Sequence, residues 1–232
     1  MTHPRNISVF ISALVSLLLL LMMPQQAYAQ YKKKKQQPQV ADTIPLFRGF
    51  AVSADLVGVA QKVTGDYGQY EAAVRLNLKD RYFPVVELGI GSADCTDDIT
   101  GLHYETSAPY ARIGVDFNLL KNKHDDYRLF AGLRYAFTSF KYDLTHPGME
   151  DPVWGNVAPY ENYDVKCSYQ WFEAVFGVDA KIWGPFHLGW SVRYKSRLSA
   201  DEGHLGNAWY VPGFGESKSS TLGGTFHVAI DI

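Results

Sequence analysis

Apolar and polar residues alternate along most of this chain after its first forty or so residues. In the segment 70–79 (YEAAVRLNLK), the even positions hold tyrosine, alanine, valine and leucine, whereas the odd positions include Glu71, Arg75 and Lys79. Because successive side chains of a β-strand point to opposite faces, such a segment predicts a strand with one apolar and one polar face. The polar face carries too many charges for an ordinary core, which favours a barrel whose apolar face contacts lipid.

Eight segments share this alternation: 47–58, 70–79, 82–92, 109–119, 127–140, 169–182, 186–198 and 219–232. Each is long enough to cross a bilayer as a tilted strand. The connections alternate in length, with short ones at 79–81, 121–126 and 183–185 and longer ones at 59–67, 93–108, 142–168 and 199–217. Short periplasmic turns and long outer loops are typical of outer-membrane barrels. The sequence therefore predicts an all-β fold, an eight-stranded antiparallel up-and-down transmembrane β-barrel.

The N-terminal segment predicts export. Residues 1–29 have the features of a cleaved signal peptide, with an apolar run followed by the small-x-small motif Ala27-Tyr28-Ala29. A retained membrane anchor is the alternative, but the apolar run of about seventeen residues is at the short limit for spanning. Residues 30–45 lack an apolar period and are expected to form a disordered periplasmic tail, and residues 46–232 to form the barrel. The expected location is the outer membrane of a Gram-negative bacterium.

The composition of the chain limits the kinds of partner that we expect. Aromatic residues make up 14% of the chain, as expected when aromatic girdles mark both membrane interfaces. The net charge of −2 argues against a nucleic-acid partner. No cofactor is expected.

Four stretches carry a family resemblance: DTIPLFRGF, NLKDRYFPVVELGIG, TSAPYARIGVDFNLL and FAGLRYAFTSFKYD. They are similar to a Bacteroidetes outer-membrane family of unknown function, and the architecture resembles the small barrels of the OmpA and OmpX type. The resemblance covers nearly the whole mature chain and implies no activity. It implies outer-membrane lipid, lipopolysaccharide and the barrel-insertion machinery as partners, although that machinery commonly reads a terminal aromatic residue and this chain ends in Ile232.

The interior of an eight-stranded barrel is only wide enough for its own side chains to fill, so function has to be argued from those side chains. With the second hairpin turning at Asp80 and Arg81, Arg75 is expected opposite Glu87, and Glu87 beside Arg112. The predicted first cluster is therefore Arg-Glu-Arg.

The same counting predicts a second cluster, in which Glu173 lies between Arg134 and Arg193. Buried charges must be paired, so two such clusters would cross-link the lumen and plug it. A gate or a proton path is the alternative interpretation. The expected lumen charge network consists of Arg75, Glu87, Arg112, Arg134, Glu173 and Arg193.

Two cysteines lie beside predicted strand ends. Cys95 follows the third strand and Cys167 precedes the sixth. Two cysteines in an exported protein favour one disulfide between the second and third outer loops, with two free thiols as the alternative.

The outer loops are the remaining candidates for function. Aromatic and proline residues gather in 145–169 and in 208–214, where rings on a rigid scaffold could form a contact surface for an extracellular ligand or could pack on one another. We therefore expect a non-enzymatic barrel with a structural or surface-interaction role. A narrow small-solute channel is the first alternative. A lipid-modifying enzyme is the second, although a hydrolase needs a serine and histidine pair on the lipid face, and His187 and His227 have inward parity.

Overall fold

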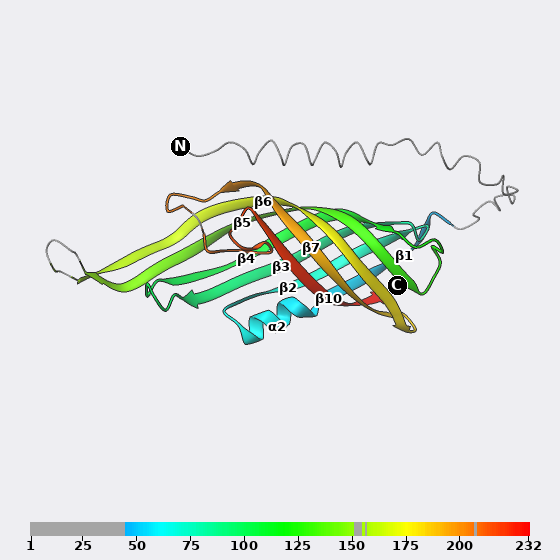
Figure 1. Cartoon of the computed structure of the whole chain (residues 1–232), viewed down its shortest axis with the longest axis horizontal. Coiled ribbons are helices and arrows are strands. Elements are labelled where there is room, and N and C mark those ends of the chain that lie inside the picture. Colours follow the sequence, from blue (N-terminus) through cyan, green and yellow to red (C-terminus); the bar gives the residue numbers. More distant parts are fainter. Residues whose placement is uncertain (1–44, 151–154, 156, 207) are drawn as a thin grey trace, which may run out of the picture. The chain divides into compact units, whose positions relative to one another are not determined.

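The computed structural model describes residues 45–150, 155, 157–206 and 208–232. The predicted signal peptide, and the predicted tail up to residue 44, lie outside the described residues. Eight antiparallel strands close into a barrel in which the neighbours follow the order β1-β10-β7-β6-β5-β4-β3-β2. Apart from the closing pair β1 and β10, strands that follow one another in the chain lie side by side (Figure 1). The predicted all-β, up-and-down barrel of eight strands is confirmed.

The elements are as follows. The barrel strands are β1 (Phe47–Asp55), β2 (Tyr67–Leu78), β3 (Tyr82–Thr96), β4 (His103–Asn118), β5 (Tyr127–Glu150), β6 (Val157–Trp183), β7 (Phe186–Asp201) and β10 (Ser220–Asp231). Helix α2 (Leu56–Thr64) connects β1 to β2, and a small hairpin of β8 (Tyr210–Val211) and β9 (Gly215–Glu216) lies between β7 and β10. No helix in the residues that the structure describes is long and apolar enough to span a membrane.

The distribution of apolar and charged side chains on the barrel wall is the reverse of that in a water-soluble protein. Large apolar side chains point outward, and Leu88 and Leu133 are 59% and 63% exposed. Charged side chains such as Glu87, Arg112 and Arg134 point inward and are buried. The alternation in the sequence therefore reports the two faces of each strand correctly.

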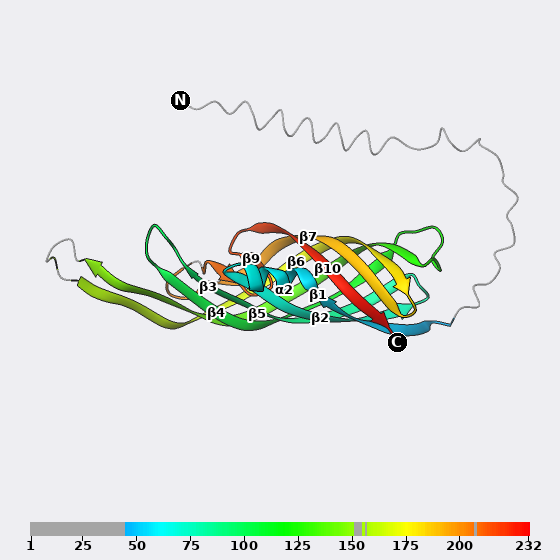
Figure 2. The same ribbon diagram turned by 90° about the horizontal axis from the view of Figure 1, so that it is seen from below.

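Strands β5 and β6 extend much further than the alternation predicts. In the segment 142–168, expected to be a loop, residues 142–150 continue β5 and residues 157–168 belong to β6, and these parts of the two strands project beyond the rest of the barrel (Figures 1 and 2). The pairing shifts register between Tyr142 and Leu144, and again between His146 and Met149. Because each irregularity interrupts the two-residue period, the apolar alternation ends before the strands do.

Helix α2 replaces the end of the first predicted strand, 47–58. Strand β1 stops at Asp55, whose carboxylate accepts hydrogen bonds from the backbone N–H groups of Val57 and Gly58 at 3.2 and 3.1 Å and so caps the helix. The helix packs closely on β2, because a Cβ atom added at Gly68 would lie 2.4 Å from the Cα of Lys62. An aspartate followed by apolar residues at helical spacing predicts a helix start. The two-residue alternation that leads into Asp55 hid this signal, because it made 47–58 resemble one continuous strand.

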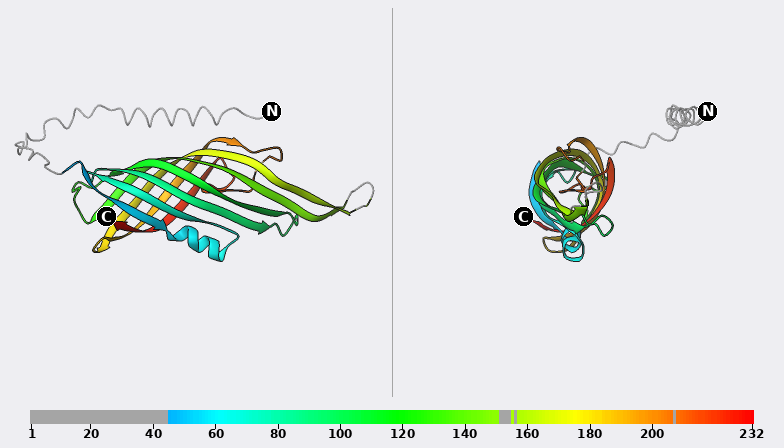
Figure 3. Two further views of the ribbon diagram at one scale, coloured as in Figure 1. Left: turned by 180° about the vertical axis from the view of Figure 1, so that it is seen from behind. Right: turned by 90° about the vertical axis from the view of Figure 1, so that its left-hand side faces the viewer.

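The connection between β7 and β10 folds into the barrel instead of standing outside it. Tyr210, Val211 and Phe214 are buried, and the hydroxyl of Tyr104 donates a hydrogen bond to the carbonyl of Tyr210 at 2.8 Å. Viewed along the barrel in the right-hand panel of Figure 3, this connection lies within the ring of strands. The rings predicted as a contact surface in 208–214 therefore pack mainly inside the barrel, in the half nearer the long connections. Trp209 is the exception and stays 40% exposed.

Candidate functional site

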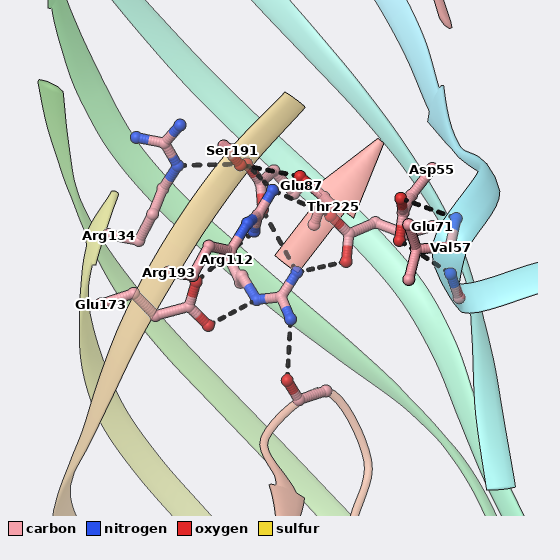
Figure 4. A network of polar contacts seen from close by, with 12 residues as sticks. Asp55, Val57, Glu71, Glu87, Arg112, Arg134, Glu173, Ser191, Arg193 and Thr225 are labelled. Atoms are coloured by element: carbon pink, nitrogen blue, oxygen red, sulfur yellow. Dashed lines mark hydrogen bonds and ion pairs between the residues drawn. The ribbon is translucent and has the colours of Figure 1, made fainter. Parts of the chain in front are cut away.

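The centre of the lumen is a single network of ion pairs built around Glu87. This carboxylate lies beside Arg112 in the pairing of β3 with β4. It contacts Arg112 at 3.2 Å, Arg134 at 3.1 Å and Arg193 at 2.6 Å, so arginines from β4, β5 and β7 converge on one acid from β3 (Figure 4). All four side chains are almost completely buried.

Arg112 extends the network across the lumen. Its guanidinium contacts Glu71 on β2, lies 2.9 Å from Glu173 on β6, and donates a hydrogen bond to the carbonyl of Gly213 at 2.8 Å. Gly213 lies between β8 and β9, in the connection that folds into the barrel. The charged centre and the inward connection therefore hold each other in place.

The predicted position of Arg75 is wrong. Leu78 pairs with Tyr82, so the turn occupies residues 79–81, and Arg75 pairs with Val85 instead of Glu87. Lys79 and Asp80 both have a φ of 55°, and this left-handed turn sets a register that composition does not reveal. Arg75 instead contacts Asp179 at 3.0 Å and Asp116 at 3.4 Å.

The second predicted cluster also differs in its contacts. Arg134 lies beside Glu173 in the strand pairing, but its guanidinium reaches over to Glu87 and holds Asp116 with two hydrogen bonds of 2.7 and 2.9 Å. The neighbour of Glu173 on β7 is Lys195, whereas Arg193 contacts Glu173 at 3.4 Å. The two clusters are therefore one network, because long arginine side chains reach past their strand neighbours.

Three further acids take part through ion pairs, Glu71, Asp116 and Asp179, and Lys195 joins them through the Gly213 carbonyl that Arg112 also contacts. Each has inward parity in the sequence, and that parity is the signal that could have included them. Odd or even position predicts the face on which a side chain lies, but it does not predict which residue that side chain contacts across the lumen.

Two histidines lie on the inner face of the barrel. The imidazole of His187 lies 3.0 Å from Asp179 and 2.9 Å from Asp231, and His227 lies 3.7 Å from Asp179. The nearby hydroxyl of Ser191 forms its hydrogen bond with Thr225 at 2.7 Å. The arrangement pairs histidines with carboxylates and does not present a serine and histidine pair to lipid. No group of three or more potential metal ligands occurs among the residues that the structure describes.

A family model matches residues 7–231, nearly the entire chain. The chain belongs to DUF6048, a domain of unknown function. No curated protein matches this DUF6048 chain.

Solved structures give distant likenesses to the DUF6048 chain. The attachment invasion locus protein Ail of Yersinia pestis, solved with the heparin analogue sucrose octasulfate, is 10% identical with a TM-score of 0.37, covering 79% of this chain and 93% of its own. CarO2 of Acinetobacter baumannii is 12% identical with a TM-score of 0.43, covering 81% and 99%. A major outer membrane protein of Thermus thermophilus is 16% identical with a TM-score of 0.39, covering 79% and 98%.

The disulfide predicted in DUF6048 is corrected by the structure, in which Cys95 and Cys167 are both free thiols. Strands β4 and β5 stand between β3, which carries Cys95, and β6, which carries Cys167. Three strand spacings amount to about 14 Å along the wall. A disulfide needs Cα atoms within about 7 Å, so the two cysteines cannot be joined without moving the strands.

At the end of the DUF6048 barrel with the short turns, Asp80 links three segments. It contacts Arg48 at the start of β1, Asn77 before its own turn, and His124 in the turn between β4 and β5. Partial burial raises the pKa of Asp80, but the hydrogen bonds from His124 and Asn77 and the charge of Arg48 outweigh it and hold the pKa below its ordinary value. Asp80 therefore remains a charged tether of these turns under mildly acidic conditions.

Proposed function

We propose that this DUF6048 protein is a non-enzymatic barrel of the outer membrane that is closed to diffusion and acts at the cell surface through its projecting hairpin. The observation that carries the proposal is the network of ion pairs that crosses the centre of the lumen. Arginines from three strands share Glu87 at its centre, and the connection between β7 and β10 is packed on top of them.

The membrane location is supported by the wall. In a closed barrel, few backbone N–H and C=O groups lack a hydrogen-bond partner. The outward side chains form an apolar surface that is more stable in contact with lipid than with water. The lumen-facing charges are compatible with that location because they are paired with one another inside the wall.

Closure to diffusion is supported by the dimensions and the chemistry of the interior. Eight strands enclose little more than their own side chains. Here the space holds three arginines and three glutamates in mutual contact, with buried rings of Tyr169, Trp171 and Phe214 above them. A solute would have to separate buried ion pairs in order to pass, which is costly in a low-dielectric interior.

The surface role is supported by the hairpin of β5 and β6. The pairing of β5 with β4 ends at Thr145, and the pairing of β6 with β7 begins at Ser168. Beyond these positions the two strands pair with each other alone, among the described strands, and their outer edges are free. Free strand edges and exposed side chains such as Tyr163 are suited to contact with another protein.

A lumen that is closed to diffusion should not conduct ions. The purified protein in a planar bilayer is expected to show no steady single-channel current, because the network and the inward connection occupy the lumen. Replacing residues 208–217 by a glycine-serine linker of equal length should produce current, since it removes the rings above Arg112 and the packing that holds the Gly213 carbonyl against Arg112. Steady current from the unaltered protein would support the channel alternative and contradict closure.

The surface role predicts a topology. A short epitope inserted at Gly155 or at Gly206 should bind antibody on intact cells, because both positions have open space around them and lie at the end with the long connections. The matched control is the same epitope at Gly184, an equally open position in the turn between β6 and β7. It should bind antibody only after the cells are permeabilised. Labelling of Gly184 but not of Gly155 on intact cells would invert the orientation.

A further inference from the structure

The barrel wall has an opening in its outer half between β2 and β10. Strand β1 pairs with β10 only from Ala51 to Asp55, which face residues 227–231. Beyond Asp55 the chain turns into α2, so residues 220–226 of β10 pair with β7 alone, and residues 67–71 of β2 with β3 alone, among the described strands. Helix α2 packs on both β2 and β10 and covers part of this opening (Figure 1).

On the outside of the barrel, the opening is surrounded by apolar side chains. Tyr70 on β2 and Leu222 and Phe226 on β10 flank it and are exposed. These side chains are of the kind that covers the rest of the outward face. A ligand that reaches the opening from this side comes from the lipid layer.

Behind the opening lies a cavity of about 300 Å³ inside the barrel. Its lining includes Arg112, Arg193 and Lys195 on the inner side, and Gly223 and Gly224 on β10 at the opening. Four of its lining residues carry positive charge and one carries negative charge, the remaining two being Lys218 and Glu216. The two arginines are paired with carboxylates of the network and Lys218 with Glu216, so Lys195 is the cation that remains for an anion.

Lys195 is the cation in this cavity whose charge is least compensated. Its ammonium group donates hydrogen bonds to the carbonyl oxygens of Gly213 and Phe214 at 2.7 and 3.0 Å. No carboxylate of the described residues lies within ion-pair distance of it, although the side chain is only 7% exposed. A buried cation held by neutral carbonyl groups is costly, and a bound anion would offset that cost.

An apolar groove on the outer surface adjoins the same helix. It encloses about 580 Å³ and is lined by Leu56 and Val59 of α2 together with Tyr70, Leu88 and Ile90 of β2 and β3. Gln61 of α2 lines the inner cavity, so one short helix borders both the charged site and the apolar one. The pair of sites matches a molecule with an anionic head and an acyl chain.

We propose that the cavity binds the phosphate-bearing headgroup of a membrane lipid that enters sideways between β2 and β10, while its acyl chain lies in the groove beside α2. The proposal rests on the membrane location proposed above. The ammonium group of Lys195 supplies the donor for the phosphate oxygens, and the positive charges of Arg112 and Arg193 lie in the same lining. The glycines of β10 leave the space through which the head passes.

Native mass spectrometry of the full barrel in neutral detergent tests this binding. The probes are phosphatidic acid, diacylglycerol with the same acyl chains, and inorganic phosphate. The unaltered protein should retain phosphatidic acid and release diacylglycerol, which lacks the charge, and inorganic phosphate, which lacks the chain. Retention of diacylglycerol, or of inorganic phosphate, as strongly as phosphatidic acid would overturn the proposal.

Two variants address the cavity from different sides. Lys195→Met removes the charge at nearly constant volume, and Gly223→Leu fills the cavity while every charge remains. A Cβ atom at Gly223 meets the Cε of Lys195 at 3.4 Å, an ordinary contact, so the second variant should fold. Each is expected to weaken retention of phosphatidic acid by about tenfold or more.

The control is Lys141→Met, which removes an exposed lysine that contacts Asp164 at 2.8 Å, away from the cavity. It should retain phosphatidic acid like the unaltered protein. Equal retention by Gly223→Leu and the unaltered protein would show that the lipid binds elsewhere. Heat-modifiable gel mobility, recorded for each variant, separates a folding defect from a binding defect. If the unaltered barrel folds and inserts into vesicles but binds no phosphatidic acid, this inference alone is refuted. If the unaltered barrel never inserts into vesicles, the membrane location is refuted.

Discussion

The substitution Glu87→Gln is expected to lower the free energy of unfolding by about 3 to 5 kcal/mol. Glu87 is the only acid in the described chain that contacts Arg112, Arg134 and Arg193 together. Glutamine keeps the shape of the side chain but removes its charge. Three buried guanidinium groups would then share the remaining carboxylates, and buried cations without compensation are costly.

The measurement is the urea midpoint of unfolding in detergent micelles, followed by heat-modifiable mobility on a gel. Glu105→Gln is the matched control, because Glu105 lies on β4 with its side chain exposed. It should shift the midpoint little. A midpoint for Glu87→Gln that coincides with that of Glu105→Gln would mean that the network contributes nothing to stability.

The strands of the barrel could be predicted from the sequence because their apolar face must be continuous. An outward face in contact with lipid tolerates few polar residues, so the two-residue period of segments such as 82–92 and 186–198 is strict. The same period put Glu87 and Arg112 on the inward faces of their strands, and the structure pairs them between β3 and β4.

The features that the sequence did not predict depend on local chemistry or on distance across the lumen. The end of β1 follows from the helix cap at Asp55, and the true length of β5 and β6 follows from two register shifts that hide the period. The inward fold of the connection around Tyr210 depends on rings from several strands meeting in space. The partners of Arg134 depend on the reach of its side chain across neighbouring strands, which strand counting cannot supply.

Trp171→Ala should be the most damaging apolar substitution in the barrel, with a loss of about 3 to 5 kcal/mol in the free energy of unfolding. The indole is 0% exposed, and its N–H donates a hydrogen bond to Glu173 at 2.7 Å. Its ring meets Phe214 edge to face at a centroid distance of 5.6 Å. One side chain therefore connects the charged network below it to the inward connection above it.

Two comparisons separate these roles. Trp171→Phe keeps an aromatic ring against Phe214 but loses the hydrogen bond to Glu173, so it should cost less than alanine. Trp183→Ala removes an indole that is 77% exposed at the turn between β6 and β7, and its urea midpoint should remain close to that of the unaltered protein. Because Trp171→Ala also leaves Phe214 of the connection without its nearer ring contact, this variant should pass current in a planar bilayer where Trp183→Ala does not. A silent bilayer and an unchanged midpoint for Trp171→Ala would mean that the inward connection is held without this ring and that the lumen is closed by the ion pairs alone.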